Sequence, residues 1–155
     1  MKESNQKPVT RNQIGRIKAI SISKKKGTRK ENIDEAVLEE NFGIVGDAHA
    51  GGERQVSLLA IESIDKMRKK GLKVGPGDFA ENITTEGIDL LSLKIGDKLG
   101  IGSEAMLEIT QKGKECLVRC SIYYRTGDCV MPREGIFAKV MRNGTIKPGD
   151  EIAVL

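Results

Sequence analysis

The sequence has 155 residues, of which 31% are charged and 38% hydrophobic, and this balance predicts one soluble globular domain rather than a disordered chain or a membrane protein. No run approaches the roughly 18 apolar residues that a spanning helix needs, so we expect no membrane partner. The formal net charge is +4, but aromatic residues make up only 3% and Trp is absent, so stacking surfaces for bases are scarce and we expect no nucleic-acid partner.

The first 13 residues contain no apolar segment of the kind that a secretory signal requires. We therefore expect a flexible N-terminal segment over residues 1–13 and a cytoplasmic location. Cytoplasmic thiols stay reduced, which predicts that the cysteines of this chain are free.

The following residues predict a strand and then turns. Residues 14–23, IGRIKAISIS, have the alternation of a strand. The basic run 23–30, SKKKGTRK, is interpreted as a solvent-exposed hairpin tip or loop. Residues 31–43 fit either a short helix or a strand, and residues 43–55, GIVGDAHAGGERQ, predict a glycine-punctuated loop.

The clearest helix is predicted over residues 57–71, SLLAIESIDKMRKKG. Its apolar residues recur every three to four positions, Ser57 can cap its start, and Gly71 can end it. Residues 74–90 are too rich in turn residues to be regular throughout. Long ordered loops of this kind often carry function.

Two later segments share a pattern, LKIGDKLGIG at 93–102 and IKPGDEIAVL at 146–155. We interpret this as shared turn chemistry, in which Gly-Asp lets the chain enter a strand, rather than as a true repeat. Between them, residues 105–110 and 118–124 alternate like half-buried strands, and residues 135–144 fit a short helix or a strand. Many short strands and one clear helix predict a mainly β fold, either a barrel or a sandwich.

All three cysteines lie in one stretch, CLVRCSIYYRTGDC, at positions 116, 120 and 129. A structural zinc site normally uses four ligands, often in Cys-x2-Cys pairs, and this spacing does not provide them. The reducing compartment disfavours a disulfide, as does the separation of Cys116 and Cys120 along a strand. The remaining interpretations are a reactive thiol and an ordinary core residue.

The residue pattern leaves both interpretations of Cys120 open. On a strand, Cys120 shares a face with Val118 and Ile122, as a buried cysteine would. Its surroundings in the sequence are also basic, with Arg119 and Arg125 close by. Nearby cations lower the pKa of a thiol and favour the reactive thiolate.

Two polar motifs are candidates for ligand binding. GDAHAGGERQ places Asp47, His49 and Arg54 around three glycines. This is either a turn in which Asp47 caps backbone amides, or a glycine-rich loop that approaches an anionic ligand with His49 and Arg54 as donors. ENITTEG offers Asn82 and Thr84 as hydrogen-bonding groups, and a capped turn is the alternative there.

Five segments, taken in order, resemble the MOSC family, the domain named for the C-terminal part of molybdenum-cofactor sulfurase. They are GIVGDAHAGGERQVSLLAIES, GDFAENITTEGIDL, LKIGDKLGIG, RCSIYYRTGDCVMPREGIFAKV and GTIKPGDEI. The resemblance implies a single MOSC domain over residues 14–155, of the compact bacterial form. It implies a mainly β, barrel-like fold with a few short helices.

The resemblance also implies a function linked to the molybdenum cofactor. The family's characteristic cysteine is proposed to carry sulfur as a persulfide or to ligate molybdenum. In amidoxime-reducing members it follows an arginine, as Cys120 follows Arg119 here. We therefore expect Cys120 to be the catalytic and metal-ligating residue, with Cys129 second. The cofactor-contacting asparagine of those members corresponds to Asn82, and the molybdopterin site is expected to contain Asp47, His49, Arg54, Asn82, Thr84 and Arg119.

Three functions remain open on this basis. The first is a protein that binds the cofactor or carries sulfur, with molybdopterin or a sulfur-donor protein as its partner. The alternatives are a non-catalytic module for cofactor binding and delivery, and a reductase that detoxifies N-hydroxylated compounds. The threonine-rich run of amidoxime reducers is replaced here by SIYYRTGD, which argues against assuming that reduction. We expect no pyridoxal phosphate, because in the sulfurase it belongs to another domain.

Overall fold

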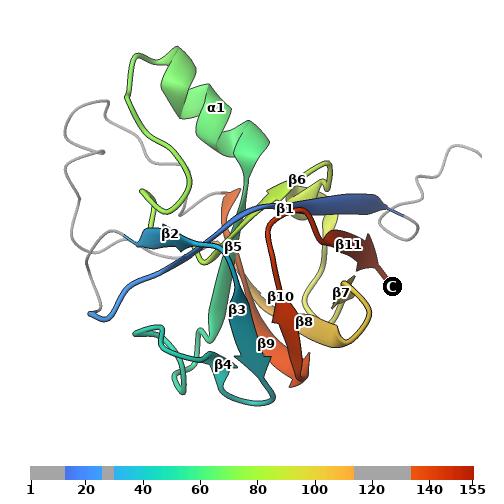
Figure 1. The fold of residues 1–155 in the computed structure, drawn as a ribbon. Coiled ribbons are helices and arrows are strands. Elements are labelled where there is room, and N and C mark those ends of the chain that lie inside the picture. Colours follow the sequence, from blue (N-terminus) through green and yellow to red (C-terminus); the bar gives the residue numbers. More distant parts are fainter. Residues whose placement is uncertain (1–12, 26–29, 114–133) are drawn as a thin grey trace, which may run out of the picture.

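The computed structural model describes residues 13–25, 30–113 and 134–155 (Figure 1). Along these residues the elements are β1 (Ile14–Ile22), β2 (Glu31–Ile33), β3 (Ala36–Glu39), β4 (Gly43–Ile44), β5 (Val56–Ala60), α1 (Ile61–Lys69), β6 (Ile83–Glu86), the 3-10 helix η1 (Leu90–Ser92), β7 (Lys98–Ile101), β8 (Ala105–Lys112), β9 (Ile136–Arg142), β10 (Gly144–Ile146) and β11 (Glu151–Val154).

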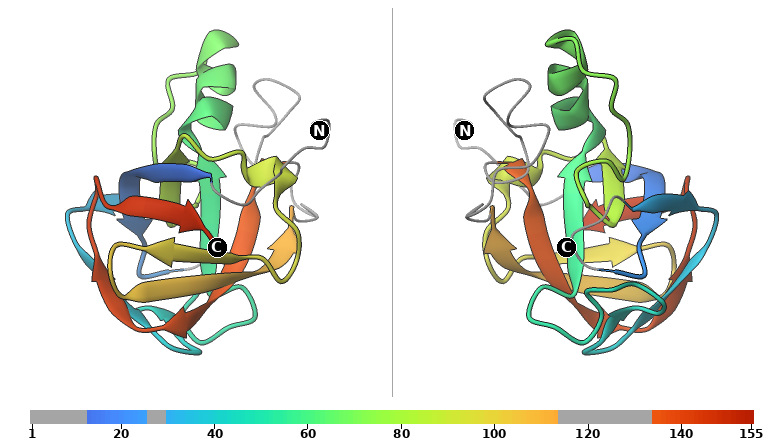
Figure 2. Two further views of the ribbon diagram at one scale, coloured as in Figure 1. Left: turned by 90° about the vertical axis from the view of Figure 1, so that its right-hand side faces the viewer. Right: turned by 90° about the vertical axis from the view of Figure 1, so that its left-hand side faces the viewer.

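Seven of these strands form a closed barrel. The order is β11-β7-β8-β9-β5-β6-β1, and the barrel closes because β1 also pairs with β11. β2 extends the sheet from β1, and β10, β3 and β4 form a second, three-stranded sheet. The helix α1 projects from one end of the barrel, as both side views show (Figure 2). The predicted mainly β, barrel-like fold is therefore confirmed.

Strand alternation explains the two apolar clusters of the protein. One face of each barrel strand points inward, so side chains such as Ile83, Leu58 and Leu107 are fully buried in the barrel interior. The other face of β5 supplies Leu59, which packs with α1 residues including Ile64 in a separate cluster outside the barrel. Burial of this kind is the main stabilising term of a domain this size.

The predicted helix over residues 57–71 is wrong in its first turn. Residues 57–60 belong to β5, a strand whose five residues are all buried, and the helix starts only at Ile61. β5 is covered by the barrel interior on one side and by the α1 cluster on the other, so its residues are buried on both faces and, apart from Ser57, are apolar. The predicted end is confirmed, because Gly71 follows the helix with a φ of 93°.

The shared turn chemistry of the two Gly-Asp segments is confirmed. The Asp97 carboxylate accepts the backbone N–H of Lys94 at 2.8 Å, and the Asp150 carboxylate accepts that of Lys147 at 2.9 Å. In both turns the glycine before the aspartate has a positive φ. The strands that follow, β7 and β11, pair with each other, so the two turns lead into adjacent strands of the barrel.

The structure decides the segments that the sequence left ambiguous. Residues 31–43 form strands β2 and β3 and lead into β4, and residues 135–144 are mostly the strand β9. The turn-rich stretch 74–90 contains one strand, β6. The strand expected at 118–124 and the N-terminal segment to residue 12 lie outside the described residues. None of the helices in the described ranges is long and apolar enough to cross a membrane.

Candidate functional site

Buried charges meet where the chain leaves β1 and enters β2. Nζ of Lys30 lies 2.7 Å from Oδ1 of Asp47, and both side chains are 0% exposed. The same ammonium lies 3.3 Å from the Ser23 hydroxyl and 3.2 Å from Nδ1 of His49. A buried charge is costly unless it is paired and hydrogen-bonded, and here it is both. We refer to Ser23, Lys30, Asp47 and His49 as the lysine cluster.

Asp47 is the main acceptor of the lysine cluster. Besides Lys30, it accepts the backbone N–H groups of Ser23 and His49, each at 3.1 Å. Burial acts to raise the pKa of Asp47, but the nearby His49 side chain, the hydrogen bonds from Lys30 and Ser23, and the charge of Lys30 outweigh it and hold the pKa well below its usual range. Asp47 thus caps backbone amides, as one of the two sequence interpretations has it, and does so within a buried ion pair.

The glycine-rich loop uses its own backbone amides internally. The six N–H groups of residues 47–52 all donate to acceptors within the protein. A phosphate-binding loop instead presents free N–H groups to its ligand. An anionic ligand at this loop would therefore meet the side chain of His49, which is 33% exposed, rather than this backbone.

Asn82, predicted to contact the cofactor, joins two strands of the barrel. Its Oδ1 accepts the N–H of Ser57 at 3.0 Å and lies 3.2 Å from the Ser57 hydroxyl, while Nδ2 donates to the Ser21 carbonyl at 3.1 Å. Asn82 is 1% exposed. Both ends of its amide have partners inside the protein, so its contact with a cofactor stays a prediction.

Thr84 supports a neighbouring turn. Its hydroxyl donates to Oε2 of Glu81 at 3.0 Å, and the same carboxylate accepts the backbone N–H groups of Gly77 at 2.8 Å and Phe79 at 3.2 Å. Glu81 is fully buried, and this burial raises its pKa against the hydrogen bonds that it accepts. The sequence analysis did not single out Glu81, which organises the turn that leads into β6.

Arg54 has partners other than the lysine cluster. Its Nε donates to Oε1 of Gln111 at 3.2 Å, and its guanidinium carbon lies 5.4 Å from the ring centroid of Phe137. Gln111 and Phe137 are register partners on β8 and β9. The structure therefore holds Asp47 and His49 together, whereas Arg54 contacts the β8–β9 pair.

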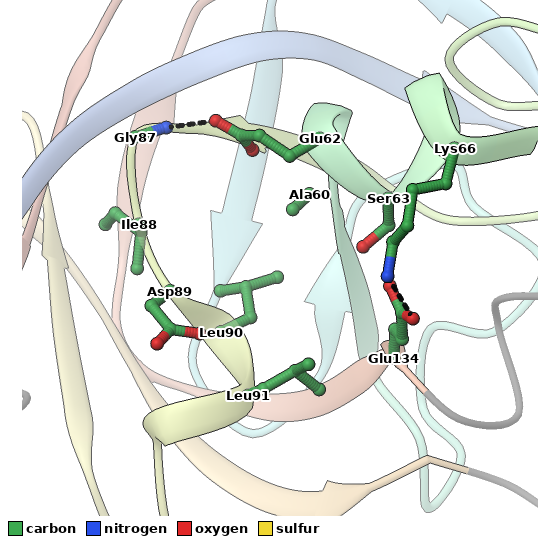
Figure 3. A pocket seen from close by; sticks show the side chains of 10 residues that line it. All are labelled: Ala60, Glu62, Ser63, Lys66, Gly87, Ile88, Asp89, Leu90, Leu91 and Glu134. Atoms are coloured by element: carbon green, nitrogen blue, oxygen red, sulfur yellow. Dashed lines mark hydrogen bonds and ion pairs between the residues drawn. The ribbon is translucent and has the colours of Figure 1, made fainter. Parts of the chain in front are cut away.

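A pocket lies at the other end of β5 and β6. It has a volume of about 360 Å³ and opens between α1, the residues after β6, and the start of β9 (Figure 3). Leu90 and Leu91 lie on one side of it, and Lys66 lies on the other with its Nζ 2.6 Å from Oε2 of Glu134. The register places the lysine cluster beyond the N-terminal end of β6 and this pocket beyond its C-terminal end.

The chain enters and leaves the cysteine-bearing segment at the pocket end of the barrel. Gly113 precedes residues 114–133, and its N–H donates to the Gly135 carbonyl at 2.6 Å. Glu134, which follows them, lines the pocket. Arg119, Cys120 and Cys129 lie outside the described residues, so their roles stay predictions. Within residues 13–25, 30–113 and 134–155, no group of three His, Cys, Asp or Glu side chains could hold a metal ion.

Lys30 is a second residue that the sequence analysis missed. It belongs to the basic run 23–30, which was predicted to be exposed, and the run is indeed exposed at Lys24 and Lys25. For Lys30 the prediction is wrong, because Asp47, 17 residues later, supplies a buried counter-charge. The only sign in the sequence was the position of Lys30 directly before β2. A side chain at such a position points either into the protein or toward solvent, and the sequence does not decide which.

The low pKa of Asp47 predicts a loss of stability in acid. An acid whose pKa is lower in the folded state stabilises the fold above its unfolded pKa, near 3.8, and this contribution disappears as the pH falls further. The raised pKa of Glu81 has the opposite sign, since its contribution is lost as the pH rises. Urea unfolding between about pH 2 and 6 should therefore show a weaker acid dependence in Asp47→Asn than in the wild type. A surface control, Asp65→Asn, should keep the wild-type dependence, and equal slopes in all three proteins would contradict the assignment.

A model of the MOSC domain matches residues 45–153 of this chain. Among solved structures, the YuaD protein from Bacillus subtilis aligns with a TM-score of 0.78 and 22% identity, covering 93% of this chain and 97% of that one. YiiM from Geobacillus stearothermophilus aligns with a TM-score of 0.67 and 18% identity, covering 91% of this chain and 75% of that one. YiiM from Escherichia coli gives 0.62 and 20%, with coverages of 90% and 69%. At these identities the structures show a common fold.

No curated protein sequence matches the chain. The family model, in contrast, spans most of its length, including the loop of Asp47 and His49, the strand β6 and all three cysteines. MOSC domains are associated with the molybdenum cofactor. The barrel and the family match together show that this chain belongs to the MOSC domain family.

Proposed function

We propose that this protein works in molybdenum-cofactor chemistry, by binding the cofactor, by carrying sulfur as a persulfide on Cys120, or by both. The observation that carries the proposal is the family match over residues 45–153, which includes both His49 and Cys120. The arginine that precedes Cys120 supports its choice over Cys116 and Cys129, because a neighbouring cation favours the thiolate.

The described residues fit the organic part of the cofactor better than its metal. His49 and Arg54 are at least partly exposed and offer N–H donors, which suit the oxygens of a phosphate. The metal contact would depend on Cys120, whose soft thiolate suits molybdenum. When bound, the cofactor would supply redox chemistry, while the side chains of this protein would hold and orient it.

Sulfur transfer needs only thiol chemistry. The Cys120 thiolate would attack the outer sulfur of a persulfide on a donor protein, so that a new S–S bond forms on Cys120 as the donor's S–S bond breaks. The donor leaves as a thiolate, and no outside oxidant or reductant is required. Cys129 is the second candidate for the same role.

The test is the mass and metal content of the protein purified from a host that makes the molybdenum cofactor. We expect the wild type to carry one added sulfur on Cys120 or about one molybdenum per chain. Cys120→Ala should abolish either signal, because it removes the thiolate that carries the sulfur or ligates the metal, while the matched variant Cys116→Ala should keep it.

The outcomes separate the alternatives. Cofactor that binds equally well to Cys120→Ala would support a non-catalytic binding and delivery module. Loss of the signal only in Cys129→Ala would move the reactive role to Cys129. A wild type with neither added sulfur nor molybdenum would contradict the proposal.

A further inference from the structure

The Lys30 ammonium has three polar neighbours within hydrogen-bonding distance in the lysine cluster. They are Oδ1 of Asp47 at 2.7 Å, Nδ1 of His49 at 3.2 Å and the Ser23 hydroxyl at 3.3 Å. An ammonium group has donors only. The nitrogen of His49 that faces it must therefore be an acceptor.

We infer that Lys30 is a positioning residue that fixes His49 as the neutral tautomer with its proton on Nε2. A proton on Nδ1 would face an N–H of Lys30 across 3.2 Å, donor against donor. The Asp47 carboxylate does not offer that proton an alternative, because its Oδ2 is 3.8 Å from Nδ1, too far for a hydrogen bond.

Asp47 fixes the positions of both Lys30 and His49. Its Oδ1 accepts from Lys30, and its Oδ2 accepts the backbone N–H of His49 at 3.1 Å. One buried carboxylate thus fixes both the ammonium and the backbone of the histidine that the ammonium contacts. Buried partners that fix the tautomer and orientation of a histidine are a common support for binding and catalytic sites.

The consequence is that the ring of His49 offers a ligand one N–H donor in a fixed position. The His49 side chain is 33% exposed, and with Nδ1 occupied its only N–H is on Nε2. The site then favours a ligand that presents an acceptor oxygen, such as a phosphate oxygen. The identity of this ligand as the pterin phosphate rests on the proposed function, but the tautomer does not.

His49 is the only histidine in the sequence, so its ring nitrogens can be assigned without ambiguity in a long-range ¹H–¹⁵N correlation spectrum of the uniformly labelled protein. We expect the wild type at neutral pH to show the Nε2–H tautomer alone. An Nδ1–H tautomer, or a mixture of the two, would overturn the inference. The result is independent of Cys120 and of the cofactor, so failure of the proposed function would not affect it.

Variants test whether Lys30 is the cause. Reversing the pair in Lys30→Glu/Asp47→Lys places a carboxylate against Nδ1 and should select the Nδ1–H tautomer. In Lys30→Met/Asp47→Asn, which keeps the cluster free of net charge, both tautomers should appear. Lys66→Met removes a lysine at the pocket and should leave the wild-type spectrum unchanged. A folded double variant that keeps the Nε2–H tautomer alone would show that Lys30 does not set it.

Discussion

Asp47→Asn should lower the free energy of unfolding by about 3 kcal/mol, the cost typical of removing one partner from a buried ion pair. Both carboxylate oxygens of Asp47 are acceptors, of Lys30 and Ser23 on one and of His49 on the other. The asparagine amide keeps one acceptor but turns an NH₂ group toward a donor. It also leaves the Lys30 ammonium without a counter-charge at 0% exposure.

A double-mutant cycle separates the cost of leaving the Lys30 charge unpaired from the cost of disturbed packing. Adding Lys30→Met to Asp47→Asn removes the unpaired ammonium, and we expect it to recover about 2 kcal/mol, the size of coupling seen between contacting charged groups. The exposed pair of Asp65 and Arg68 is the matched control, and Asp65→Asn should cost less than about 1 kcal/mol. Urea unfolding measures five proteins: the wild type, Asp47→Asn, Lys30→Met, their double variant and the control Asp65→Asn. Additive effects of the two cluster substitutions would mean that the buried pair is not coupled.

Gly77→Ala should lower stability by a similar amount, about 3 kcal/mol. Gly77 has a φ of 93°, and a Cβ added there would lie 2.6 Å from the Lys30 carbonyl oxygen and 2.9 Å from the Ser21 hydroxyl oxygen. The positive φ costs a non-glycine residue roughly 1–2 kcal/mol, and overpacking costs about 1–3 kcal/mol more. Because the N–H of Lys30 donates to the Gly77 carbonyl at 3.2 Å, relief of the clash would also displace the lysine cluster.

Gly96→Ala is the control for the backbone conformation alone. Gly96 has a φ of 99°, and its added Cβ would meet no described atom within 4 Å. This variant should lose only the roughly 1–2 kcal/mol that the positive φ costs. Thermal or urea unfolding of both variants measures the difference in their stability, and the ¹H–¹⁵N spectrum of His49 shows whether the lysine cluster is displaced. Equal losses in the two variants, with an unchanged spectrum, would show that the contact between Gly77 and Lys30 is unimportant.

Much of the fold could be predicted because its signals are local. Alternation marked β1 and β8, and the two Gly-Asp turns were correct because each aspartate bonds to an amide three residues before it. The start of α1 could not be predicted in this way. Residues 56–60 are buried on both faces, and a short apolar run of this kind has no period that separates a strand from a helix.

The candidate site was only partly visible in the sequence. Asp47 and His49 are two residues apart, and their joint placement in one loop follows from that spacing. Asn82 and Thr84 were recognised as polar groups in a loop, but pairing with β1 and β5 buries them in the barrel wall, on the face opposite to Ile83, where Ser57 and Glu81 bond to them. No local pattern reports how deeply a polar side chain is buried, because burial depends on which strands lie beside it.

The sequence by itself determined that this is a strand-rich MOSC domain, which turns it uses, and which loop contains its single histidine. Only the tertiary structure decided that Lys30 is buried against Asp47 and contacts that histidine. The reason is physical: a lysine in a basic run is normally solvated, and its burial is tolerated only where the folded chain supplies a carboxylate and further acceptors around it. Those groups come from two separate segments, the end of β1 and the loop after β4, and the folded chain brings both against Lys30.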